Sequence, residues 1–79
     1  MPTILRIDGL RVCIYPNDHR PAHVHVIGDH EAVFNLNCPY GPIELRENYG
    51  FKQRDLTRMS KQLASHIALS CEEWSKYHG

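Results

Sequence analysis

Three histidines within seven positions, His19, His23 and His25, are the residues of this chain best suited to chemistry. Imidazole titrates near neutral pH and is the commonest metal-binding side chain in proteins. His23 and His25 alternate with Val24 and Val26, and alternate side chains of a strand share a face. The pattern therefore predicts two neighbouring imidazoles on one face of a sheet, which we call the histidine face.

Acid–base catalysis is the first chemical hypothesis for the histidine face. His23 and His25 would act as general acid and base on a phosphodiester such as RNA, without a metal. Fixed cations would stabilise the negative charge that develops on the phosphate. The arginines that we assign to this role are Arg6, Arg11 and Arg20.

Metal binding is the second hypothesis. Side chains at positions i and i+2 of a strand lie roughly 7 Å apart, so two imidazole nitrogens can meet one ion, zinc or another transition metal. We expect the ligand set His19, His23 and His25. Alternative third ligands are Asp18, His30 and Glu31.

A protein-binding module is the third hypothesis. Its contact surface would be the histidine face, an exposed sheet edge or the polar side of the last helix. In this interpretation the two histidines only bond loop carbonyls and hold the turn 17–21 in place. A basic stripe on the last helix is a further candidate binding surface, although such stripes commonly serve solubility; it contains Arg54, Arg58 and Lys61.

Length and charge restrict the function classes. The 79 residues predict a single domain, 1–79, with a small core that depends on a partner protein or on a second copy of itself. Nine acidic and nine basic side chains give a net charge of zero. This balance argues against strong sequence-independent binding of nucleic acid, so any RNA contact needs a local basic patch.

The cysteines indicate the expected location. Cys13, Cys38 and Cys71 are an odd number at wide spacing, without a Cys-x-x-Cys motif, which favours a reducing cytoplasm. We expect Cys13 and Cys71 to be small core residues and Cys38 to be a loop residue. No apolar run reaches the roughly 18 residues of a membrane span, so we expect a soluble protein.

The first half of the chain predicts two hairpins. Strands at 3–7 and 10–15 are joined by Asp8-Gly9, which suits a type I′ turn and sets the pairs Ile7–Leu10, Leu5–Val12, Arg6–Arg11 and Thr3–Ile14. Strands at 22–27 and 31–36 turn at residues 28–30, which sets the pairs His25–Val33 and His23–Asn35. The core face of this second hairpin contains Val24, Val26, Ala32, Phe34 and Leu36.

The second half predicts helices. Pro42 is expected to begin a short helix that runs to Asn48 and is closed by Gly50. From Gln53 onward one long helix carries an apolar stripe, with a break expected near Ala68. The stripe contains Leu56, Met59, Leu63, Ile67, Ser70, Trp74 and Tyr77. The expected fold is therefore α+β, with about four antiparallel strands, a short helix and a long C-terminal helix on one sheet face.

Several blocks of the sequence resemble a known family. They are Met1-Pro2-Thr3-Ile4-Leu5-Arg6-Ile7, Asn17-Asp18-His19-x-Pro21-x-His23-Val24-His25-Val26, Glu31-Ala32-x-Phe34, Asn48-x-Gly50-Phe51 and Trp74-x-x-Tyr77-x-Gly79. Together they resemble the small bacterial family of domains of unknown function numbered 4160. The resemblance implies a component of a toxin–antitoxin-like pair with a cognate small protein encoded nearby. It implies no established catalytic residue.

Overall fold

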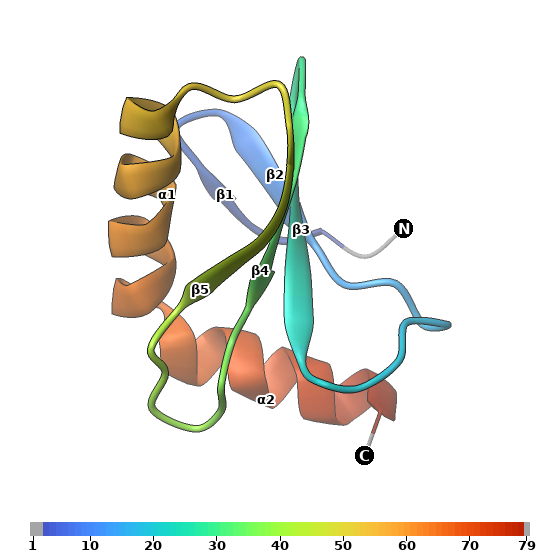
Figure 1. Ribbon diagram of the computed structural model, residues 1–79. Coiled ribbons are helices and arrows are strands. Elements are labelled where there is room, and N and C mark those ends of the chain that lie inside the picture. The colour runs from blue at the N-terminus through green and yellow to red at the C-terminus, as the bar shows by residue number, and fades with distance from the viewer. Residues whose placement is uncertain (1–2, 79) are drawn as a thin grey trace.

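The computed structural model describes residues 3–78, which form a sheet followed by two helices (Figure 1). The elements are β1 (Thr3–Ile7), β2 (Leu10–Cys13), β3 (His23–Ile27), β4 (Glu31–Asn35), β5 (Glu44–Tyr49), α1 (Gln53–Ser65) and α2 (Ile67–His78). This order confirms the α+β class. Met1, Pro2 and Gly79, which belong to the expected domain 1–79, lie outside the described residues.

The strands form one antiparallel sheet in chain order, so β3 is central and β1 and β5 are the edges. The predicted register of the second hairpin is confirmed, with His25 opposite Val33 and His23 opposite Asn35. All the residues predicted for its core face are fully buried. The histidines therefore lie on the other face, where β2 and β4 flank them.

The first hairpin follows the prediction near its turn and departs from it at its far end. Asp8 and Gly9 both have positive φ, 47° and 78°, as a type I′ turn requires. Arg6 pairs with Arg11 as expected. Thr3, however, lies opposite Cys13 instead of Ile14, because the register shifts between Thr3 and Leu5.

The predicted short helix at 42–48 is wrong, because this segment forms the edge strand β5. Its glutamate, leucine and arginine residues suit a helix locally, but β4 would otherwise present unpaired backbone groups beside β3. Charged side chains are also typical of an edge strand. Gly50 has positive φ, 112°, as predicted, but it follows a strand. Asn48 then joins β5 to α1 through hydrogen bonds with the backbone N–H and C=O of Phe51, both 3.0 Å.

The long helix predicted from Gln53 is divided in two at His66, close to the expected break. Ser65 precedes the division, and its hydroxyl donates to the Gln62 carbonyl at 2.8 Å, which competes with helical bonding. The helical half of the core contains Leu56, Met59, Leu63 and Trp74. Tyr77 was expected in the same stripe but is exposed. Neither helix of residues 3–78 is long and apolar enough to span a membrane.

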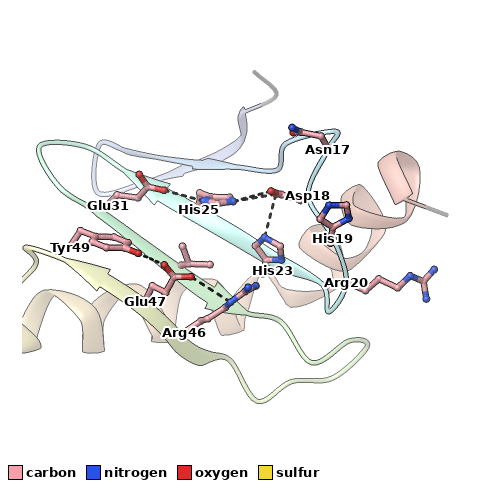
Figure 2. A pocket seen from close by; sticks show the side chains of 11 residues that line it. Asn17, Asp18, His19, Arg20, His23, His25, Glu31, Arg46, Glu47 and Tyr49 are labelled. Atoms are coloured by element: carbon pink, nitrogen blue, oxygen red, sulfur yellow. Dashed lines mark hydrogen bonds and ion pairs between the residues drawn. The ribbon is translucent and has the colours of Figure 1, made fainter.

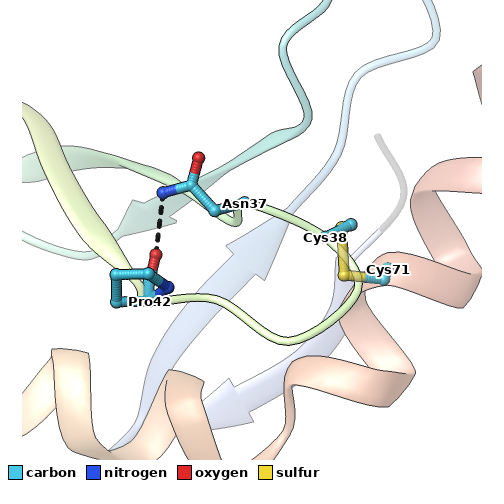
Figure 3. The surroundings of a disulfide bond; sticks show 4 residues. All are labelled: Asn37, Cys38, Pro42 and Cys71. Atoms are coloured by element: carbon cyan, nitrogen blue, oxygen red, sulfur yellow. Dashed lines mark hydrogen bonds between the residues drawn. A yellow bond between two sulfur atoms is a disulfide. The ribbon is translucent and has the colours of Figure 1, made fainter.

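The helices occupy different parts of the fold. α1 lies beside one face of the sheet, and α2 crosses below the end at which β3 begins (Figure 1). Cys38, in the loop between β4 and β5, forms a disulfide with Cys71 of α2 (Figure 3). This pair corrects the expectation that wide spacing leaves the cysteines unpaired. Cys13 is free and buried, as expected.

Candidate metal centre

An open cavity of about 580 Å³ lies over the histidine face (Figure 2). It is formed by residues 17–20 of the loop between β2 and β3 and by side chains of β3, β4 and β5. Val33, directly opposite His25, forms part of its lining. The antiparallel register thus brings loop, histidines and edge strand to one place.

His23 is the first residue of β3, and its side chain is held from two directions. Its Nδ1 lies 2.8 Å from the carbonyl oxygen of Pro21, and its ring packs against Trp74 of α2 with centroids 5.3 Å apart. Because a carbonyl only accepts, Nδ1 must carry the hydrogen of this bond. The other ring nitrogen, Nε2, then faces Asp18 Oδ2 at 3.4 Å. His23 is only 5% exposed, so solvent water has little access to its ring nitrogens.

His25 is oriented in the same sense by a carboxylate. Its Nδ1 lies 3.1 Å from Glu31 Oε2, and its Nε2 lies 3.2 Å from Asp18 Oδ2. A neutral ring that donates from Nδ1 to Glu31 turns the lone pair of Nε2 towards Asp18. The ring of Tyr15 meets His25 edge-on, with centroids 4.7 Å apart. Burial raises the pKa of Tyr15 above 10.0, and Cys13 and Glu31 raise it further, so this phenol is neutral at neutral pH.

Asp18 is positioned by the turn that follows β2. Its backbone N–H donates to the Tyr15 carbonyl at 3.0 Å, and its Oδ2 accepts from the Tyr15 backbone N–H at 3.2 Å. The carboxylate therefore both closes the turn and reaches the two imidazoles. Its relative side-chain exposure is 15%.

Asp18, His23 and His25 form a group that we call the triad. One ligand atom from each lies within 4.8 Å of the other two. For an ion with tetrahedral bonds of 2.0–2.1 Å, two ligand atoms are expected about 3.3 Å apart. The two distances from Asp18 Oδ2 to the imidazole Nε2 atoms, 3.2 and 3.4 Å, match this value. Two histidines and one carboxylate with open positions are a known ligand set for transition metals.

The structure brings Asp18, one of the alternative third ligands, beside the two histidines, whereas the predicted set contains His19. His19 lines the same cavity but is exposed, and among the described residues it is not part of the group with mutually close ligand atoms. His30 packs against Phe51, with centroids 5.4 Å apart. Glu31 contacts the ring of His25, and this contact makes it an orienting group for the triad.

The predicted cationic residues lie in three places. Arg20 lines the cavity, and its side chain extends away from the triad in Figure 2. Arg6 and Arg11 pair across β1 and β2, outside the cavity lining, and Arg11 Nη2 lies 3.7 Å from Cys13 Sγ. The basic stripe of Arg54, Arg58 and Lys61 is exposed on α1, away from the histidine face.

Three residues of β5 that were not predicted as site residues also line the cavity: Arg46, Glu47 and Tyr49. Arg46 Nε lies 3.6 Å from Glu47 Oε2, and the Tyr49 hydroxyl donates to Glu47 Oε1. This hydrogen bond raises the pKa of Tyr49. The i, i+2 spacing of Glu47 and Tyr49 would have placed them on one face, had the segment been predicted as a strand.

Comparison with known proteins identifies a family. The family model described as "Domain of unknown function (DUF4160)" matches residues 9–75. The match includes the whole triad and the three cavity residues of β5. No curated protein and no solved structure matches the chain.

Proposed function

This chain belongs to the DUF4160 family, and we propose that it is a metal-binding protein whose Asp18, His23 and His25 bind one divalent transition ion, with zinc as the first candidate. The observation that supports this proposal is the orientation of the His23 and His25 imidazole rings. The Pro21 carbonyl takes the Nδ1 hydrogen of His23, Glu31 Oε2 lies where it can take that of His25, and both Nε2 atoms lie 3.2–3.4 Å from the same oxygen of Asp18. With neutral rings that donate from Nδ1, two imidazole lone pairs and a carboxylate oxygen converge at the floor of the open cavity, and this arrangement favours a cation.

Protons are the competing cations. Protonation of His25 alone would satisfy Asp18 but would leave His23 Nε2 without a hydrogen, and protonation of both rings would place two positive charges on rings whose centroids are 5.2 Å apart. At an effective dielectric constant of 20 their repulsion is roughly 3 kcal/mol. One divalent ion avoids this repulsion, because it lies between the rings and attracts both lone pairs and the carboxylate.

Hydrolysis is the chemistry that such a centre would support. Three protein ligands leave coordination open towards the cavity, where a zinc ion acts as a Lewis acid and lowers the pKa of bound water to about 7. The metal-independent ribonuclease has less support, because the Nε2 atoms that would face a substrate face Asp18 instead. The toxin–antitoxin-like role, the cognate protein partner, the homo-oligomer and the cytoplasmic location stay predictions.

Zinc titration of protein purified without an affinity tag tests the proposal. We expect one zinc ion per chain, measured against a chromophoric chelator. His25→Ala should weaken binding by more than the 10–100-fold typical of an orienting group, because it removes a ligand. His66→Ala is the matched control, since His66 is exposed at the division between the helices.

His19→Ala distinguishes the observed triad from the ligand set predicted from the sequence. It should leave zinc affinity close to that of the wild type, since Asp18 supplies the third ligand. Circular dichroism shows whether each variant is folded. Equal zinc affinity in the wild type and a folded His25→Ala protein, or no zinc binding by the wild type, would refute the proposal.

A further inference from the structure

The edge strand β5 contains a bulge beside the cavity. Val33 pairs with Glu47 and Phe34 pairs with Leu45, so Arg46 is an extra residue that has no pairing partner in β4. Neighbouring side chains of a regular strand point to opposite faces, whereas a bulge redirects the extra side chain. Arg46 and Glu47 accordingly both line the cavity, and Figure 2 shows them entering it together from β5.

The Nε edge of the Arg46 guanidinium faces Glu47. Its ion pair with Glu47 uses Nε, at 3.6 Å, and Glu47 is held in turn by the Tyr49 hydroxyl. Figure 2 shows the guanidinium on the His23 side of Glu47. The two terminal Nη groups form the fork that binds oxyanions in a bidentate manner.

The charge of the cavity changes sign when the triad is loaded. Its lining contains three carboxylates, from Asp18, Glu31 and Glu47, and two guanidinium groups, from Arg20 and Arg46. With neutral histidines the formal charge is therefore −1, and a divalent ion changes it to +1. The cavity then attracts anions, although the metal-free protein as a whole has no net charge.

We propose that the metal-loaded cavity binds the phosphate group of a phosphoester, and that Arg46 is the protein residue that binds its oxygens. The inference rests on the proposed metal site. Phosphate fits both partners, because a guanidinium fork and a hard open coordination position each take an anionic oxygen. The cavity volume of about 580 Å³ lies within the range of small-molecule sites.

Inorganic phosphate and cobalt-loaded protein provide the test. Co²⁺ is paramagnetic, so phosphate bound at the open position should show broadened ³¹P resonances. We expect Arg46→Ala to weaken phosphate binding roughly tenfold or more, since it removes charge-assisted hydrogen bonds. The phosphate affinity of Arg46→Lys should lie between those of the wild type and Arg46→Ala. Arg54→Ala is the control, because Arg54 is an exposed arginine of α1. Cobalt affinity should not fall in any of these variants.

Each outcome has a separate meaning. Failure of the wild type to bind Co²⁺ or Zn²⁺ would overturn the proposed function and this inference together. Normal metal binding without phosphate binding would overturn the inference alone. Unchanged phosphate affinity in Arg46→Ala would overturn the role of Arg46. Equally strong binding of acetate would overturn the assignment of phosphate as the ligand class.

Discussion

Removal of the Glu31 carboxylate tests how His25 is oriented for metal binding. Glu31 Oε2 lies 3.1 Å from Nδ1 of His25. Its contact with the triad is through this ring, so its removal should affect the orientation of His25 and not that of Asp18 or His23. Loss of such an orienting partner typically weakens metal affinity 10–100-fold, or about 1.4–2.7 kcal/mol. We expect Glu31→Ala to show a loss within this range. Glu31→Gln should lose less, because its amide oxygen still accepts from Nδ1.

The same loss of zinc affinity can be expressed as a change in the free energy of unfolding. Zinc at 100 times the wild-type Kd should raise the free energy of unfolding of the wild type by about 2.7 kcal/mol. At that zinc concentration, the free energy of unfolding should rise by about 1.4 kcal/mol in a variant that binds zinc tenfold more weakly, and by about 0.4 kcal/mol in one that binds it a hundredfold more weakly. The Glu31 side chain is 43% exposed, so its removal should change the zinc-free protein by no more than about 0.5 kcal/mol.

Urea unfolding with zinc and with a chelator measures both quantities on the same protein. Glu47→Ala is the matched control, because Glu47 is a carboxylate of the same cavity whose hydrogen bond and ion pair are to Tyr49 and Arg46. Glu47→Ala should retain most of the zinc-dependent rise in the free energy of unfolding. If zinc stabilises Glu31→Ala as much as the wild type, Glu31 does not orient a metal ligand and does not set the tautomer of His25.

Two further predictions concern stability. Reduction of the Cys38–Cys71 disulfide, or its replacement by serines, should lower the free energy of unfolding by about 3.7 kcal/mol for a sequence separation of 33. Urea midpoints measured with and without reductant check this, and equal midpoints would contradict it. The pKa of Tyr15 is raised by burial and by Cys13 and Glu31, so the folded state keeps a phenol proton that the unfolded state releases. Stability should therefore fall as the pH rises above 10.0, and Tyr15→Phe should reduce this slope. An unchanged slope in Tyr15→Phe would show that Tyr15 is not its source.

The central hairpin was predictable because its information is local. The alternation of valine and histidine in β3 and the turn at 28–30 specify which side chains share a face, and the register follows by counting. β5 was not predictable in this way. Its residues favour a helix in isolation, and only the unpaired edge of β4 makes a strand the better conformation.

The composition of the triad was only partly predictable. The His23–His25 pair follows from strand geometry, whereas the choice between Asp18 and His19 depends on how the loop after β2 turns. That turn is held by Tyr15, whose backbone N–H and C=O both bond to Asp18. The contact between Trp74 and His23 joins residues far apart in the chain, and no spacing in the sequence indicates it.

The disulfide divides the molecule topologically. Cys38 follows β4 and Cys71 lies in α2, so the covalent ring encloses β5 and α1, while the triad lies on the open N-terminal branch. The two branches meet again where the Trp74 indole, three residues beyond Cys71, covers His23. Reduction would thus open the ring without breaking any bond of the triad, and would remove one covalent tether of the helix that carries this indole.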